Sequence, residues 1–282
     1  MLPAYVTAVS LATACALLSV VVVLRRWAFI GEGISHAGFG GIGTAWLLSL
    51  ALPGLTGDGA TYAVAVAFCL SVAMAIAYVS RSHGGAARSP GDEAIAGDAA
   101  IGIFLVASVA WGFLALGIYS HFRRATVADW ERYLVGDLAG TTGPRAVAAL
   151  CLCGTVVLCL AALRKEILFY TLDPLLAQVS GVRAGLVHYL LLLLLAAVIV
   201  LGMRLVGNFL VPALLVLPGS TALLLSRRLP VVTLISLASS VVGTFAGLIV
   251  ARRYAFPPGP PIVLALFLGF VAAFAVSRVR RA

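Results

Sequence analysis

Two ionisable residues stand one helical turn apart in a segment that is otherwise apolar and rich in glycine. Glu32 and His36 are four residues apart, which is about 40° around a helix, so both side chains share one face. Carboxylate and imidazole groups are ligands that Zn²⁺, Mn²⁺ and Fe²⁺ accept. The pair is a candidate metal site. An alternative role is a hydrogen bond that only fixes helix packing, and the spacing alone does not decide between them.

The same segment carries a row of small residues beside the ionisable pair. Gly33, Ala37, Gly41 and Ala45 recur every four residues, and such a ridge lets a second helix approach closely. We therefore expect this helix to pack tightly against its neighbours.

Other ionisable residues are weaker ligand candidates. Asp98 opens a later apolar segment, where a helix-capping role is the simpler interpretation. His188 lies beside a leucine run, where a hydrogen-bonded packing role is more common than metal ligation. His83 and His121 are expected in loops.

The composition excludes a soluble protein. Of the 282 residues, 62% are hydrophobic and 10% are charged, whereas soluble domains hold about 25% charged residues. The formal charge of +9 comes from basic residues between apolar runs, where they set topology and contact anionic lipids. Because no basic patch is interleaved with exposed aromatics, nucleic-acid binding is not expected.

The apolar runs predict an all-α, polytopic membrane helix bundle. The seventh run is short and holds Pro212, Pro218 and Gly219, a pattern found in broken helices that line transport paths. The number of crossings is therefore eight or nine. The nine runs cover residues 6–24, 29–52, 60–79, 99–119, 146–163, 186–205, 209–225, 231–250 and 262–276.

The loops predict orientation and domain organisation. With nine spans, the loops of one side carry roughly twice as many basic residues as the other, so the N-terminus is outside and the C-terminus cytoplasmic.

No polar stretch is long enough to fold alone, so residues 1–282 form a single transmembrane domain with a cytoplasmic loop at about 164–184. No phosphate-binding loop and no protease motif occurs, so the chain is not an enzyme and any ATP is hydrolysed by a partner.

The loop at 164–184 contains a capped segment. Asp173 can cap a short helix, Pro174 suits its first position and Gly181 can end it, with Ala177 between them. The segment is either a docking element or an ordinary connector.

Five segments of the chain resemble, in order along the sequence, the permease family of metal-ion ABC importers of the zinc, manganese and iron type. The departures are glutamate at Glu32 where aspartate is more typical, Gly97 in place of a carboxylate, and Pro212 in place of a small or polar residue. The resembling segments are RRWAFIGEGISHA at 25–37, GDAAIGI at 97–103, YLVG at 133–136, DPLLAQVSG at 173–181 and GNFLVPALLVLPGSTA at 207–222.

The resemblance implies a function and partners. Glu32 and His36 would be metal ligands in the translocation path, and residues 173–181 would form the coupling helix that seats in an ABC ATPase subunit. The permease would be a homodimer in the bacterial plasma membrane, fed by an extracytoplasmic metal-binding protein. Its fold would be that of the cobalamin and siderophore importers, with the metal as substrate and no permanently bound cofactor. A secondary metal transporter and an ABC permease for a chelated metal are the alternatives.

Overall fold

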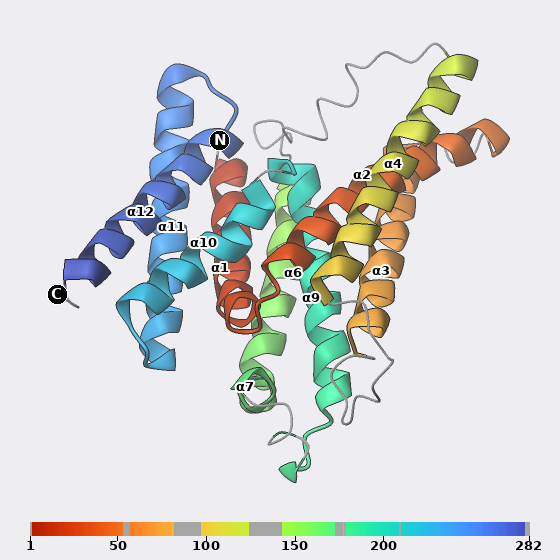
Figure 1. Ribbon diagram of the computed structural model, residues 1–282. Coiled ribbons are helices and arrows are strands. Elements are labelled where there is room, and N and C mark those ends of the chain that lie inside the picture. The colour runs from red at the N-terminus through yellow and green to blue at the C-terminus, as the bar shows by residue number, and fades with distance from the viewer. Residues whose placement is uncertain are drawn as a thin grey trace. The chain divides into compact units, whose positions relative to one another are not determined.

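The computed structural model describes residues 2–52, 57–81, 97–123, 143–172, 177, 179–208 and 210–279. Every regular element that it names in these ranges is an α-helix (Figure 1). The helices are α1 (Leu2–Leu24), α2 (Ala28–Ala51), α3 (Asp58–Arg81), α4 (Gly97–Arg123), α6 (Gly143–Ala162), α7 (Arg164–Leu172), α9 (Ala184–Val206), α10 (Leu210–Leu225), α11 (Leu229–Tyr254) and α12 (Gly259–Val279).

Each of the nine apolar runs is a helix, which confirms the all-α membrane bundle. Among the described residues, 7 helices are long and apolar enough to cross a membrane: α1, α3, α4, α6, α9, α11 and α12. The chain is therefore a multi-pass membrane protein. Helix α2 is outside this set although its 24 residues reach about 36 Å, because glycines, Glu32 and His36 lower its hydropathy. Helix α10 has 16 residues, or about 24 Å, against the roughly 30 Å of the hydrocarbon core.

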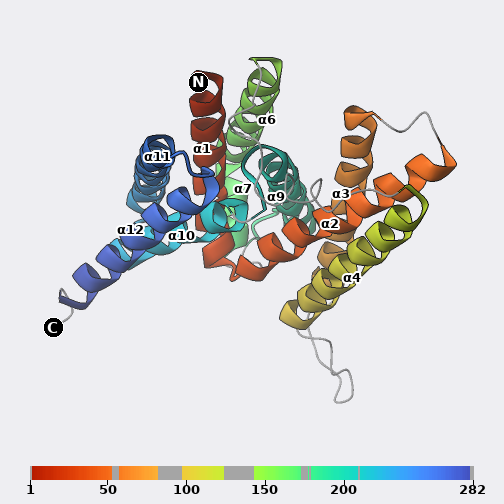
Figure 2. The ribbon, with the colours of Figure 1, turned by 90° about the horizontal axis from the view of Figure 1, so that it is seen from above.

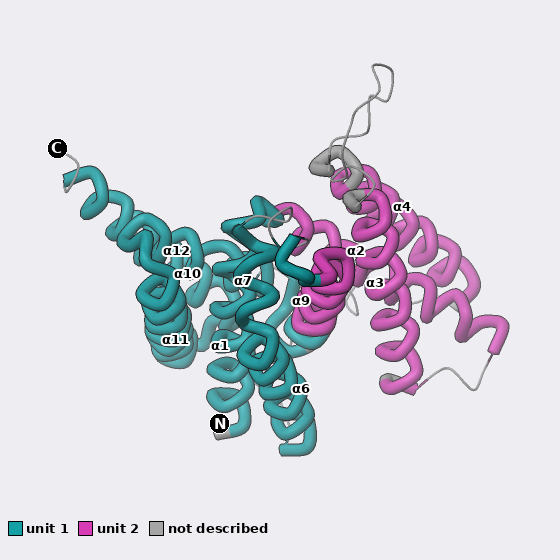
Figure 3. The backbone as a smooth tube through the Cα atoms, turned by 90° about the horizontal axis from the view of Figure 1, so that it is seen from below, with its two compact units in different colours: residues 1–28, 130–182, 201–282 teal, residues 29–129, 183–200 magenta. Residues whose placement is uncertain are grey.

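The chain divides into two compact units, which Figure 3 shows in two colours. Unit 1 comprises residues 1–28, 130–182 and 201–282, and unit 2 comprises residues 29–129 and 183–200. Each unit is described by itself below. The interpretation of the whole chain as one permease domain stays a prediction.

Helix α1 is the centre of unit 1, where it contacts α6, α10 and α11. Hydroxyl groups of α11 bond to backbone carbonyls of α1: Ser236 Oγ donates to Ala16 O at 2.8 Å, and Ser240 Oγ donates to Ala12 O at 2.9 Å. In hydrocarbon, where apolar burial drives little association, such bonds and close packing hold helices together. They set the register of α1 against α11.

Helices α11 and α12 approach closely at two glycines. A methyl group on Gly243 would meet the side chain of Leu266, and one on Gly247 would meet the backbone of Ile262. Gly243 and Gly247 are four residues apart, a small-residue spacing that lets two helices approach closely, and α12 is the helix that approaches here.

Helix α10 continues through its internal proline. Pro218 has no N–H, so it cannot donate to the carbonyl one turn before it. The next residue, Gly219, donates its N–H to Ser19 Oγ of α1 at 2.8 Å, and a Cβ atom at Gly219 would come within 2.6 Å of Ser19 O. The backbone N–H that follows the proline is therefore paired with a side chain of α1, as a buried donor must be where no water is present.

Unit 2 is built on the glycine-rich face of α2, which lies against α3 and α4 (Figure 2). A Cβ atom at Gly41 would come within 2.8 Å of Ala65 Cα in α3, and one at Gly43 within 2.8 Å of Ala115 Cβ in α4. Real Cβ atoms essentially never come so close, so only glycine lets these helices meet at this separation. The four residues of the predicted ridge, Gly33, Ala37, Gly41 and Ala45, are all buried.

Ser19→Ala removes the acceptor for the Gly219 N–H and leaves a buried donor unpaired. We expect it to lower the free energy of unfolding by about 0.6–2 kcal/mol. Thermal unfolding of the purified protein in detergent measures this loss. Thr13→Val, which removes a hydroxyl that bonds to Val9 O of the same helix, is the control and is expected to change stability less. Equal effects of the two variants would contradict the assigned role of Ser19.

Gly41→Ala is expected to destabilise the protein, because the added methyl group meets the backbone of Ala65, which cannot turn aside. The matched control is Gly117→Ala in α4, where a Cβ atom would meet nothing within 4 Å. An open helical glycine gains about 0.4–1 kcal/mol from this change, so the two variants should shift the melting temperature in opposite directions. Shifts of the same sign would mean that α2 and α3 do not meet at Gly41.

Candidate metal site

The carboxylate of Glu32 and the imidazole of His36 lie side by side on α2. His36 Nδ1 is 3.3 Å from Glu32 Oε1 and 3.1 Å from the Glu32 backbone carbonyl. A nitrogen facing two oxygens acts as the donor, and the proton on Nδ1 leaves Nε2 with a free lone pair. This is the tautomer and the orientation that a metal-binding histidine needs.

The pair is only partly covered by the rest of the chain. The side chain of His36 is 27% exposed and that of Glu32 is 40% exposed, while Gly33 and Gly41 on the adjacent face are buried against α3 and α4. Phe39 lies next to His36 with the ring centroids 5.8 Å apart. The helix thus uses its small residues for packing and leaves its two ionisable side chains accessible.

Of the two other candidate ligands, the structure describes the side chain of His188 but not that of Asp98. Asp98 lies in the first turn of α4, and its side chain is outside the described part. His188 is buried on α9, where its ring meets that of Tyr189 edge-on at 5.7 Å. Within the described residues, no three His, Cys, Asp or Glu side chains come together as a metal cluster. Among the described side chains, Glu32 and His36 are therefore the two candidate ligands that lie together.

The predicted coupling segment is described only at its end. Asp173 and Pro174 lie outside the described residues, whereas Ala177 and Gly181 lie within them. Gly181 has φ +79°, and the N–H of Val182 donates to Ala177 O at 2.9 Å. This is the bond pattern that ends a helix at a left-handed glycine, so Gly181 ends the short helix as expected. Its role in docking an ATPase stays a prediction.

Helix α7 was not expected from the sequence, which suggested a loop there. Its residue Tyr170 lies over the guanidinium of Arg25, for which the sequence predicted no partner. No spacing rule could have found this contact, since the two residues are 145 positions apart.

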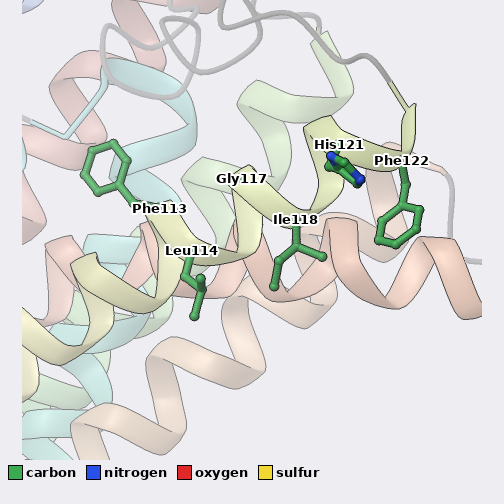
Figure 4. A pocket seen from close by; sticks show the side chains of 6 residues that line it. All are labelled: Phe113, Leu114, Gly117, Ile118, His121 and Phe122. Carbon is green, nitrogen blue, oxygen red and sulfur yellow. The ribbon is translucent and has the colours of Figure 1, made fainter.

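A shallow hollow on α4 is lined mainly by apolar side chains and brings no pair of candidate metal ligands together (Figure 4). It is lined from that one helix by Phe113, Leu114, Gly117, Ile118, His121 and Phe122. His121 lies in the last turn of α4 and not in a loop, because the helix continues to Arg123. Exposed apolar side chains are normal where lipid is the solvent, so this surface does not compete with the pair on α2.

Comparison with known proteins gives the family. The model of the ABC 3 transport family matches residues 1–277. The manganese transport system membrane protein MntC of Halalkalibacterium halodurans is 31% identical over 265 residues, which cover 93% of this chain and 82% of that protein. The chelated iron transport system membrane protein YfeD of Yersinia pestis is 30% identical over 277 residues, which cover 98% of this chain and 85% of that protein.

Two solved structures share the fold. PsaBC from Streptococcus pneumoniae, solved in complex with Fab, superposes with a TM-score of 0.76 at 26% identity and covers 96% of this chain and 89% of its own. An inward-facing metal-chelate type ABC transporter superposes with a TM-score of 0.62 at 14% identity. The superposition covers 99% of this chain and 85% of that chain. The family match over nearly the whole length confirms the resemblance that the sequence motifs indicated. This chain is a transport permease that belongs to the ABC 3 transport family.

Proposed function

We propose that the chain is the membrane-spanning permease subunit of an ATP-driven importer for a divalent transition metal ion of the zinc, manganese and iron class. The observation that carries this proposal is the Glu32–His36 pair, a carboxylate and an imidazole 3.3 Å apart on a helix long enough to cross the membrane. Ionisable residues within a segment that crosses the membrane are costly and are usually kept for a transport path. Relatives named as manganese and chelated iron transport proteins support the substrate class.

The incomplete ligand set suits a transported ion. Glu32 offers carboxylate oxygen and His36 offers ring nitrogen, whereas a stably held zinc ion has four ligands. Because Nδ1 of His36 faces Glu32 in this structure, binding of one ion by both groups would require the imidazole to turn. The remaining positions would be filled by water or by the same pair of a second protomer. A site along a transport path must bind strongly enough to admit the ion and weakly enough to release it, and a small number of donors among the described residues favours release.

Energy would come from a partner. The chain has no phosphate-binding loop, so ATP hydrolysis is assigned to ABC ATPase subunits that seat against residues 173–181. The working unit would be a permease homodimer with two ATPase subunits and an extracytoplasmic metal-binding protein. In the bacterial plasma membrane, the excess of basic residues on one set of loops gives an outer N-terminus and a cytoplasmic C-terminus.

Glu32→Gln and His36→Ala test the site. Glu32→Gln removes the carboxylate charge and His36→Ala removes the imidazole donor. We expect cellular metal uptake to fall at least about tenfold, as measured by elemental analysis of cells grown in Zn²⁺, Mn²⁺ or Fe²⁺. His121→Ala changes an exposed histidine at the end of α4 and serves as the control with unchanged uptake. The amount of membrane-inserted permease is measured in parallel. Undiminished uptake in either site variant would refute the assignment of these ligands.

A liposome experiment separates ATP-driven import from secondary transport. Mn²⁺ flux is measured across vesicles that hold the chain alone and across vesicles that also hold its ATPase subunits, with and without ATP. We expect flux only when the ATPase, ATP and the metal-binding protein are all present. Mn²⁺ flux through the chain alone would favour the secondary transporter.

A further inference from the structure

The turn between α1 and α2 directs an arginine toward α7. Helix α1 ends in this turn, where Arg26 takes φ +58° and the N–H of Trp27 donates to Val22 O at 2.8 Å. A left-handed conformation at a residue other than glycine costs about 1–2 kcal/mol. The turn is thus held in an unfavourable conformation. The residue before Arg26 is Arg25, and its side chain contacts Tyr170 of α7.

Arg25 is held against α7 by a hydrogen bond and by ring stacking. Its Nη2 donates to the Tyr170 hydroxyl at 3.0 Å, and its guanidinium lies 4.4 Å from the centre of the Tyr170 ring and 5.5 Å from that of Trp27. Burial raises the pKa of Tyr170, a shift that the nearby Arg25 opposes, so the phenol stays neutral and accepts the bond. A planar guanidinium can stack and donate at once, which a lysine cannot do.

Helix α7 leads directly into the predicted coupling segment. A single residue, Leu163, separates it from α6, and Figure 1 shows α7 nearly end-on below α6. Its buried side chains are Ile167, Tyr170 and Thr171, and it ends at Leu172, immediately before Asp173. Helix α7 is therefore the described element that directly precedes the predicted coupling segment 173–181 along the chain.

The contact also lies next to the point where the chain passes from unit 1 to unit 2. Unit 1 ends at residue 28 on this side, three residues after Arg25 and four before Glu32. A displacement of α7 that pulls on Arg25 therefore acts, through the covalent chain, on the first turn of the helix that carries the metal-binding pair.

Two buried charged atoms near this contact have no partner. Arg25 Nε and Glu166 Oε2 are both buried and make no hydrogen bond. Glu166 precedes Tyr170 by one helical turn, so the two side chains share a face of α7. Unpaired buried charges are costly, and a shift of α7 by one turn past Arg25 would pair them.

We propose that Arg25 is a positioning residue that transmits movement of the ATPase-docking segment to α2, with Tyr170 as its partner in this structure and Glu166 as its partner in a second position of α7. This inference rests on the proposed function, because it assigns a route between the ATPase and the metal-binding pair. It concerns coupling between the two activities and not metal binding itself.

The test uses the complete complex of permease, ATPase and metal-binding protein in liposomes. ATP hydrolysis is measured with and without Mn²⁺, and Mn²⁺ transport is measured per ATP hydrolysed. For Arg25→Lys and Tyr170→Phe we expect normal basal hydrolysis and a loss of about fivefold in Mn²⁺ stimulation, the effect of about one hydrogen bond. Tyr254→Phe, which changes an exposed tyrosine at the end of α11, is the control and should behave as the unchanged protein.

A double variant decides whether the two residues act through each other. Arg25→Lys combined with Tyr170→Phe should lose no more stimulation than the more impaired single variant. Losses that multiply, or normal stimulation in both single variants, would overturn the proposal. Copurification of the ATPase with each variant shows that the complex still assembles, and Tyr170→Phe, which removes one oxygen atom, is the variant least able to disturb folding.

Glu166→Gln tests the second position of α7. It leaves the Arg25–Tyr170 bond intact but removes the charge that would receive Arg25, so basal hydrolysis should stay normal while Mn²⁺ stimulation falls. Normal stimulation would overturn the role of Glu166. A complex of unchanged protein that shows no Mn²⁺ stimulation would contradict the proposed function and this proposal together, whereas impaired stimulation only in the variants supports both.

Discussion

The absence of water in the hydrocarbon core is the constraint on which the rest of the structure depends. Every backbone group must be paired within the protein, and apolar burial contributes little to helix association. The chain meets both demands with continuous helices, with glycines such as Gly41 and Gly247 that let helices approach, and with hydroxyl groups that bond across helices. Ser19 is the clearest case, since it accepts the Gly219 N–H beside the internal proline of α10.

The same constraint makes the candidate site conspicuous. In a solvent that penalises charge, α2 keeps a carboxylate and an imidazole in contact and partly exposed, while its other face packs against α3 and α4. The small residues of α2 and its ionisable pair thus lie on separate faces of one helix, so that packing and the proposed transport role can be tested by separate mutations.

Sequence reasoning reached most of the fold and part of the site. The nine apolar runs became helices because run length and hydropathy are local properties, and the ending of a short helix at Gly181 followed from the conformational freedom of glycine. Helix α7 escaped prediction because its nine residues, Arg164–Leu172, begin with three charged side chains and carry no apolar run of membrane length. Its order comes from burial of Ile167 and Tyr170 in unit 1, which no local pattern encodes.

The sequence by itself determined the membrane class, the nine apolar helices and the shared face of Glu32 and His36, because each depends on composition or on the period of a single helix. Only the tertiary structure decided which distant residues meet. Arg25 and Tyr170 are 145 positions apart and Ser19 and Gly219 are 200 positions apart, and such pairs form only when helices pack in one register. The tautomer that leaves His36 Nε2 free also needed the structure, because it depends on distances to two oxygens of Glu32 that spacing alone does not give.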